Sequence, residues 1–324
     1  MSPPPRSAAV TLGTRASALA RLQTQLVADA LEAAWADLAC ATEALVTAGD
    51  RSQASGEPLP EIGGKGLFTA ELERALLAGE IDLAVHSLKD LPTDEAPGVA
   101  VGAVCARDDA RDCLVSSDGS TLAGLPPGSV VGTSSLRRAA QLRALRPDLE
   151  IRSIRGNVDT RVRKVREGRY GAVVLGAAGV RRLALTGEVS EWLSPETMLP
   201  APGQGALGVQ CRAGDERVLT LLTAIDDPAA RAETAAERTF LRELGGGCAA
   251  PVAAHARVVA GSEGGAAAPQ GTLRVRMDGL VAAVDGSEVV RVTGEGSAVE
   301  LGERLAREAL DAGAERILAA IRVR

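Results

Sequence analysis

The strongest constraint on the fold is a repeated order of short apolar strands, each followed by a helix. In the first hundred residues this pattern predicts strands at 8–12, 43–47 and 81–85, with helices at 16–34 and 67–77 between them. Strands separated by helices are joined by crossovers, which connect parallel neighbours in a sheet. The sequence therefore predicts a mostly parallel α/β domain at the start of the chain.

The same order returns in the middle of the chain. Strands at 129–131, 150–154 and 172–175 each lead through glycine or hydroxyl residues into a helix, which predicts a second α/β domain. A proline-rich crossover at 199–205 then precedes a strand at 208–211 that we expect to return to the first sheet.

The composition changes after residue 226. A helix at 229–244, three strand-like runs at 252–260, 272–284 and 288–294, and a helix at 299–321 predict a smaller α+β domain. Because 324 residues exceed the size of one typical domain, the length predicts two or three domains. We expect domain 1 at 1–105 and 205–225, domain 2 at 106–204, and domain 3 at 226–324.

Composition excludes several classes of protein. Hydrophobic residues at 46% and charged residues at 24% exclude disorder over most of the chain. The 5 cysteines form no C-x-x-C pair, and the 2 histidines, His86 and His255, stand apart, so we expect no metal site. We expect a cytoplasmic protein without membrane contact, since neither a signal-peptide pattern nor a long apolar run is present.

Positive charge is concentrated in one segment of an acidic chain. Between Arg137 and Arg182 there are 12 arginines and 1 lysine against 4 acidic residues, whereas the whole chain carries a formal charge of −6. A solvated basic face and a site for a polyanionic ligand explain the charge equally well. The placement of the arginines favours the ligand.

These arginines fall at the predicted strand-to-helix junctions. In a parallel sheet such junctions lie at one edge, where open α/β folds bind ligands and helix N-termini offer donors to anions. Several arginine-bearing junctions predict several separated carboxylates, for which bidentate arginine contacts are suited. The junction residues are Thr133, Ser134, Ser135, Arg137 and Arg138, then Arg155, Gly156 and Arg161, and finally Arg181 and Arg182.

Nucleic acid is a weaker candidate ligand. Aromatic residues make up only 2% of the chain, which leaves little for base stacking, and the overall charge is negative. The glycine-rich run at Lys65 is not a phosphate-binding loop, because Leu67 stands where that motif needs serine or threonine.

Two residues are candidates for chemistry. Asp90 follows the predicted strand 81–85, where it is either a turn residue before Pro92 or a carboxylate that stabilises a developing cation and exchanges protons. Cys248 follows three glycines, where it is either a buried small side chain or an accessible thiol that anchors a covalent group. We interpret the other cysteines as structural.

Taken together, the motifs closely resemble the porphobilinogen deaminase family, also called hydroxymethylbilane synthases. The matching stretches appear in family order from residue 13 to about 251, and the set is far more specific than any one motif. They are GTRAS (13–17), GGKGLF (63–68), HSLKDLP (86–92), GTSSLRR (132–138), RGNV (155–158), PGQGA (202–206) and GGC (246–248).

The resemblance implies a fold, an activity and a cofactor. The fold has two periplasmic-binding-protein-like α/β domains with a cleft between them, plus a smaller C-terminal α+β domain. The activity joins four porphobilinogen molecules head to tail with release of ammonia, then hydrolyses off hydroxymethylbilane for tetrapyrrole biosynthesis. The cofactor is a dipyrromethane bound to Cys248 through a thioether, and the catalytic aspartate matches Asp90.

The resemblance also implies roles for other residues. Lys65, Phe68 and Gly203 are candidates for a mobile loop and a hinge. Residues expected to bind cofactor and substrate, through their acetate and propionate groups, are Arg15, Ser17, Ser87, Lys89, Thr133, Ser134, Ser135, Arg137, Arg138, Arg155, Gly156, Arg161, Arg182 and Gln204.

The resemblance implies a small-molecule substrate and an enzyme that receives the product. Porphobilinogen is the substrate, the product passes to uroporphyrinogen-III synthase, and the family implies a monomer. Two alternatives stay open on the residues alone. A non-catalytic two-lobe carboxylate-binding protein needs neither Asp90 nor Cys248, and a nucleic-acid-binding regulator would bind DNA with a steep salt dependence.

Overall fold

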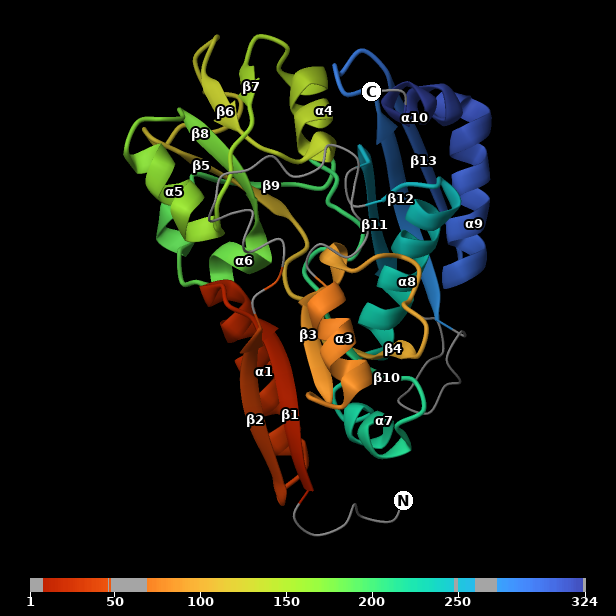
Figure 1. The fold of residues 1–324 in the computed structure, drawn as a ribbon. Coiled ribbons are helices and arrows are strands. Elements are labelled where there is room, and N and C mark those ends of the chain that lie inside the picture. Colours follow the sequence, from red (N-terminus) through yellow and green to blue (C-terminus); the bar gives the residue numbers. More distant parts are fainter. Residues whose placement is uncertain (1–7, 46, 48–68, 248–249, 260–272, 323–324) are drawn as a thin grey trace. The chain divides into compact units, whose positions relative to one another are not determined.

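The computed structural model describes residues 8–45, 47, 69–247, 250–259 and 273–322 (Figure 1). The chain divides into two compact units, Met1–Arg107 with Ala206–Arg231 and Asp108–Gly205 with Ala232–Arg324. Within the described ranges, no helix has the length and apolar character required to cross a membrane.

Unit 1 contains a five-stranded mixed sheet. Its strand order is β2 (Leu38–Leu45), β1 (Ala8–Arg15), β3 (Leu83–Ser87), β10 (Leu207–Arg212) and β4 (Val99–Val104). The first three strands are parallel, whereas β10 is antiparallel to both of its neighbours. The strand predicted at 208–211 therefore returns to the first sheet as expected, and β4 is an additional strand.

Among the described residues of unit 1, three helices accompany this sheet: α1 (Ala18–Ala34), α3 (Ala70–Ala78) and α7 (Glu216–Leu222). The first begins two residues later than predicted, because Ser17 is its N-cap and accepts a hydrogen bond from the Ala20 N–H at 3.3 Å. Leu12 and Leu31 are fully buried between α1 and the strands. This apolar layer fixes the strands whose carboxyl ends carry Arg15 and Ser87.

The first sheet of unit 2 has the same arrangement. Its order is β7 (Glu150–Arg152), β6 (Val130–Gly132), β8 (Ala172–Gly176), β5 (Asp112–Ser116) and β9 (Glu191–Leu193). The first three strands are parallel, and β5 is antiparallel to β8 and β9. After the parallel strands come α4 (Leu136–Leu145), α5 (Val158–Arg166) and α6 (Ala177–Arg182), and a short 3₁₀ turn, η2 (Thr186–Glu188), precedes β9.

The last part of unit 2 is an antiparallel sheet with helices. Its strands, in order, are β11 (Val252–Val258), β12 (Arg274–Ala282) and β13 (Val289–Ser297), and α8 (Pro228–Glu243) and α9 (Ala298–Ala309) pack with them. The prediction of a single terminal helix at 299–321 is wrong. A π-helical turn, η3 (Leu310–Ala314), separates α9 from α10 (Glu315–Arg322), because Gly313 adopts a φ of 110°.

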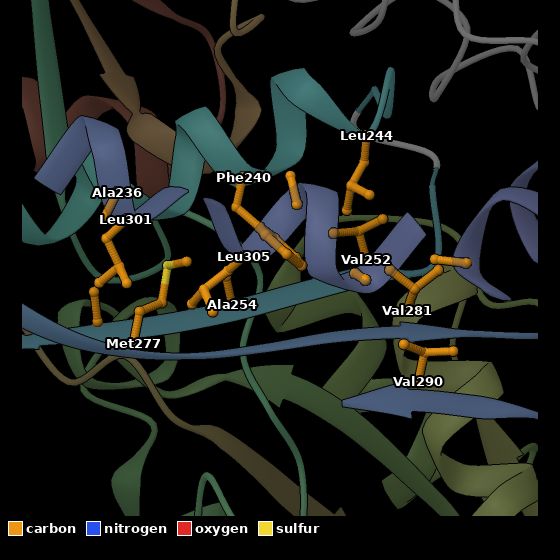
Figure 2. Packing of buried hydrophobic residues seen from close by; sticks show 14 of the residues in the cluster. Ala236, Phe240, Leu244, Val252, Ala254, Met277, Val281, Val290, Leu301 and Leu305 are labelled. Carbon is orange, nitrogen blue, oxygen red and sulfur yellow. The ribbon is translucent and has the colours of Figure 1, made fainter. Parts of the chain in front are cut away.

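Phe240 from α8 is the largest fully buried side chain of this core (Figure 2). Figure 2 shows it beside Leu305 of α9, above a sheet that contributes Met277 and Val281. Gly279 makes room for the ring, since a Cβ at that position would lie 2.8 Å from Phe240 Cζ. The predicted fold class is confirmed, with two α/β sheets of matching topology and a smaller α+β part.

The outer edge of β11 is covered by acceptors from the rest of unit 2. The Ala254 N–H donates to the Pro200 carbonyl at 3.1 Å, the Ala256 N–H to Glu237 Oε1 at 2.7 Å, and the Val258 N–H to Glu233 Oε1 at 3.1 Å. Two carboxylates of α8 thus satisfy backbone donors that an edge strand normally exposes.

Replacing Phe240 with alanine removes the largest buried side chain of the third sheet's core. We expect the local opening free energy of β12 to fall by about 3–5 kcal/mol. Hydrogen–deuterium exchange of peptides from 274–282 measures this change. Val299→Ala is the control, because Val299 is 48% exposed and should alter exchange little. Equal exchange in the two variants would contradict the assignment of Phe240 to the core.

Candidate active site

The carboxyl edge of the parallel strands in unit 1 carries the predicted Asp90 motif. Strand β3 ends at Ser87 and continues into the 3₁₀ turn η1 (Leu88–Asp90). Leu88 and Leu91 are 1% and 3% exposed, so they hold the turn from both sides of Lys89 and Asp90. Lys89 is half-buried, and Asp90 is exposed. The turn therefore presents a carboxylate to solvent on a fixed backbone.

Other predicted residues lie at the same edge. Arg15 is the last residue of β1, which is parallel to β3, and Ser17 caps the helix that follows. Ser87 Oγ accepts a hydrogen bond from Gln23 Nε2 at 2.9 Å. Both Arg15 and Ser17 are half-buried. Unit 1 thus gathers Arg15, Ser17, Ser87, Lys89 and Asp90 at one edge of one sheet.

His86 lies beneath this edge and is neutral at ordinary pH. Its side chain is 6% exposed on β3. Burial lowers the pKa of His86 to about 4, and the positive charge of Arg15 adds to this effect. His86 is therefore no proton donor near neutral pH, and Asp90 is the better candidate for acid–base chemistry at this edge.

The first junction of unit 2 is built from hydroxyl groups. Ser135 caps α4, and its Oγ accepts a hydrogen bond from the Arg138 N–H at 3.4 Å. Ser134 Oγ lies 2.9 Å from Ser153 Oγ and donates to the Ile154 carbonyl at 2.7 Å. These contacts tie the loop after β6 to the loop after β7. Thr133 is buried and precedes both serines.

The second junction positions half-buried cationic side chains. Gly156 adopts a φ of 106°, and a Cβ there would lie 2.7 Å from Thr160 Cγ2. Arg161 Nε donates to the Gly156 carbonyl at 2.7 Å, and Lys164 Nζ donates to the Arg155 carbonyl at 2.9 Å. The tight glycine turn therefore lets the side chains of α5 fold back over the loop.

The third junction places Arg182 beside the crossover. Its Nη2 donates to the Gly205 carbonyl at 2.8 Å, and its Nε lies 3.7 Å from Asp108 Oδ2. The neighbouring Arg181 pairs with the other oxygen of Asp108 at 3.2 Å. Only Arg182 of the two is largely shielded, with a side chain 9% exposed against 54% for Arg181.

Arg137 and Arg138 are buried around one carboxylate. Arg137 Nη1 lies 2.7 Å from Asp112 Oδ2 and donates to the Leu199 carbonyl at 2.8 Å. Arg138 Nη2 lies 2.7 Å from Asp112 Oδ1, and its Nη1 donates to the Val174 carbonyl at 3.1 Å. Burial alone would raise the pKa of Asp112, but the two guanidinium groups hold it well below its usual range.

The predicted ligand residue Gln204 is also buried in this cluster. Its Nε2 donates to Asp112 Oδ1 at 2.8 Å, to the Ala110 carbonyl at 2.8 Å and to the Arg111 carbonyl at 3.2 Å. These bonds fix the crossover to the start of β5. Whether Gln204 also meets ligand stays a prediction.

The glycines of the crossover have defined roles in the backbone. Gly203, with a φ of 76°, donates its N–H to Glu237 Oε2 at 2.7 Å. Gly205 has a φ of 94°, and a Cβ there would lie 2.4 Å from the Asp108 carbonyl oxygen. The part of the crossover predicted as a hinge is thus held by buried hydrogen bonds on both sides.

Some predicted residues lie outside the described part of the chain. These are Cys248, the predicted cofactor anchor, and Lys65 and Phe68, the predicted loop residues.

Burial raises the pKa of the Cys40 and Cys211 thiols to about 11 and that of Cys113 to about 12. Within the described ranges, no group of three or more His, Cys, Asp or Glu side chains is placed to hold a metal ion.

Sequence reasoning missed Asp112. A signal was present, because an aspartate directly precedes the apolar run Cys113–Leu114–Val115 and a fully buried carboxylate needs a cation. Arg137 and Arg138 are the first junction arginines after Asp112 in the sequence, so they were the candidates for this cation. The arginines of the basic segment therefore lie in three settings: some are buried against Asp112, some are half-buried at the sheet edge, and some are exposed in ion pairs with glutamates.

This set of donors suits a ligand with several carboxylates. The edge of unit 2 offers helix N-termini, hydroxyl groups and three half-buried arginines, Arg155, Arg161 and Arg182. Nε of Arg137 and Nε of Arg138 have no acceptor among the described residues, although both side chains are buried. Unit 2 therefore has more donor capacity than its own described acceptors use.

The chain matches two family models over most of its length. The model described as "Porphobilinogen deaminase, dipyromethane cofactor binding domain" matches residues 10–220. The model described as "Porphobilinogen deaminase, C-terminal domain" matches residues 232–311. These matches confirm the resemblance that the motifs predict.

Curated relatives carry the same description, porphobilinogen deaminase. One from Roseiflexus castenholzii is 50% identical over 313 residues, which is 96% of this chain and 98% of the relative. One from Mycolicibacterium paratuberculosis is 49% identical over 317 residues, which is 97% and 98%. Similarity to solved structures is lower: the periplasmic VFT2 domain of Bordetella pertussis BvgS is 12% identical with a TM-score of 0.40, covering 67% of this chain and 86% of that domain.

We predict that unit 1 loses stability as the pH falls from 6.5 towards 4. The unfolded chain binds a proton at His86 in this range while the folded chain does not, so unfolding at pH 5 should cost about 2 kcal/mol less than at pH 7. Urea unfolding followed by Trp35 fluorescence, in a Trp192→Phe background, measures the change. His86→Asn should flatten it, and an unchanged pH slope in that variant would contradict the assignment.

Proposed function

Because the chain belongs to the porphobilinogen deaminase family, we propose that it joins four porphobilinogen molecules head to tail, releases ammonia at each step and then hydrolyses off hydroxymethylbilane. It is a transferase of tetrapyrrole biosynthesis that works with a dipyrromethane cofactor. The alternative of a non-catalytic carboxylate-binding protein is disfavoured. This chain matches relatives described as porphobilinogen deaminases over nearly their whole length.

One observation supports the proposal most directly. Cationic and hydroxyl side chains of unit 2 gather at the carboxyl edge of its three parallel strands, and they come from three separate junctions. Each pyrrole of the substrate carries an acetate and a propionate group. A chain of pyrroles therefore presents carboxylates at intervals, and a single cationic pocket would not match them.

The residues of unit 2 fit the dipyrromethane as an anionic group. When bound, the cofactor supplies the pyrrole carbon to which the first substrate unit is joined. Its carboxylates would be held by Ser135, Arg137, Arg138, Arg155, Arg161 and Arg182, and the loops around them would be shaped by Thr133, Ser134 and Gly156. The thiol of Cys248 would form the thioether that keeps the cofactor attached.

Asp90 would be the catalytic residue. As ammonia leaves the aminomethyl group, positive charge develops on the pyrrole, and a nearby carboxylate lowers the energy of that state. Asp90 would accept hydrogen bonds from pyrrole N–H groups and would assist proton transfer to the leaving amine. Its exposure, on a turn anchored by Leu88 and Leu91, is consistent with contact to substrate.

Arg15, Ser17, Ser87 and Lys89 would bind substrate carboxylates at the edge of unit 1. We further propose a cytoplasmic monomer that passes its product to uroporphyrinogen-III synthase. Lys65, Phe68 and Gly203 remain proposed loop and hinge residues. The predicted division into domains at 1–105 with 205–225, 106–204 and 226–324 is likewise proposed.

The mass of the intact, denatured protein tests the cofactor proposal. We expect an increment equal to two linked, deaminated porphobilinogen units, located by peptide mapping on the peptide with Cys248. A protein without it should acquire it on incubation with porphobilinogen. Cys248→Ser should never acquire it, with Cys105→Ser as the matched control that still does. Failure of the wild-type protein to acquire the adduct would reject the proposal.

Replacing Asp90 with alanine should reduce kcat by at least about 10²-fold, because the carboxylate acts on the developing cation. The adduct on Cys248 and the thermal unfolding midpoint should stay near wild type when the cofactor is supplied during preparation. Asp94→Ala is the control, since Asp94 is an exposed aspartate four residues further along. Near-normal ammonia release by the Asp90 variant would show that another group performs this step.

A further inference from the structure

We propose that Asp112 is a positioning residue for the reaction, which fixes the guanidinium groups of Arg137 and Arg138 in the arrangement that receives a ligand carboxylate. This inference rests on the proposed function. Asp112 touches no ligand in this proposal, because its side chain is fully buried. It acts through the two arginines and through Gln204, which share its oxygens.

The geometry of helix α4 makes such a residue necessary. Arg137 and Arg138 are consecutive in the first turn of the helix, and consecutive helical side chains leave the axis about 100° apart. Two guanidinium groups also repel each other. A carboxylate that contacts each at 2.7 Å, one through each oxygen, overcomes both effects and holds the pair together.

Further contacts restrict the cluster to one arrangement. Arg137 is also bound to the Leu199 carbonyl and Arg138 to the Val174 carbonyl, so each guanidinium is fixed at two points. Gln141, one turn along α4, binds the Leu199 carbonyl from Nε2 at 3.0 Å and accepts the Leu199 N–H at 2.8 Å. The carbonyl that orients Arg137 is thus itself held in place.

The charge of the cluster supports a role beyond stability. Two arginines and one aspartate leave one positive charge in excess, inside a part of unit 2 where all three side chains are buried. A buried ion pair contributes little net stability compared with apolar packing, whereas an unbalanced charge favours an anion. One ligand carboxylate would neutralise the excess positive charge of the cluster, whereas a second would make its net charge negative.

Gln204 connects this cluster to the crossover. Its Nε2 shares Asp112 Oδ1 with Arg138 and binds two carbonyls at the start of β5. The next residue, Gly205, accepts the bond from Arg182, another predicted carboxylate ligand. A displacement of the crossover would therefore move Asp112 and the arginines together. Asp112 is the residue through which the crossover and the first junction are coupled.

Asp82 provides a matched control in unit 1. Its carboxylate also contacts two arginines, Arg212 at 2.9 Å and Arg217 at 3.5 Å, and it accepts the Thr11 N–H at 3.0 Å. It lies at the amino end of β3, whereas Asp90 follows the carboxyl end. Asp82→Asn removes the same kind of interaction away from every predicted ligand residue.

The test compares wild-type holoenzyme with D112N, D112E, Q204M and D82N. For D112N we expect KM for porphobilinogen to rise more than kcat falls, with kcat/KM reduced about 10²-fold by misplacement of the arginines. D112E should recover part of the loss, because it restores the charge. D82N should lower the unfolding midpoint with KM within about twofold of wild type.

Nitrogen-15 spectra of the cofactor-free proteins give a readout that does not depend on activity. Sharp, slowly exchanging Nη–H signals of Arg137 and Arg138, the groups that donate to Asp112, should be present in wild type and D82N and lost in D112N. Arg→Lys variants assign these signals. Q204M keeps the charge of Asp112, so it should broaden these signals and raise KM by a smaller factor. If D112N does not fold, the signals and KM of Q204M test the proposal in its place.

Two results would overturn the inference. Unchanged signals and KM in D112N or Q204M would show that the arginines need no positioning. An equal rise in KM for D82N would show that the effect is loss of stability alone. Wild-type enzyme that neither turns over nor carries the adduct would reject the proposed function instead, while the signals would still report on Asp112.

Discussion

Parallel strands oblige the chain to place every strand-to-helix junction at the same edge of the sheet, and the proposed chemistry depends on this constraint. In unit 2 it brings together three loops that are separated by twenty or so residues each, with Ser135, Gly156 and Arg182 at or near them. In unit 1 it brings Arg15 and Asp90 to one edge. A ligand with regularly spaced carboxylates needs such a row of donors, and no single loop supplies one.

Much of the fold could be predicted because its helices and buried strands carry a strong periodic signal. Strand β8 and the helix around Leu142 are examples, with buried residues where the pattern places them. Strands β4, β5 and β9 were missed. Strand β4 includes Gly102, which packs under Leu222 and Cys211 and has no side chain to contribute to a pattern. The apolar run of β5 is short, and β9 has three residues. The break at Gly313 depends on one backbone angle, which periodicity does not reveal.

The site was predictable to the extent that it depends on motifs and on junction position. Asp90, Arg155 and Arg182 lie at sheet edges as expected. Burial could not be predicted, because it depends on partners distant in sequence. Arg137 and Arg138 meet Asp112, which lies 25 and 26 residues away, and Gln204 reaches it from 92 residues away. The sequence pattern showed a basic segment, and the structure separates its arginines by what surrounds them.

The covered edge of β11 has a consequence for the behaviour of the chain in a crowded solution. Edge strands with free N–H groups are templates for pairing with another molecule, the first step of many aggregation pathways. On β11 the donors of Ala256 and Val258 are already taken by glutamates of α8. A foreign strand would have to displace these charged acceptors to pair there, so the carboxylates of α8 disfavour growth of the sheet on this side.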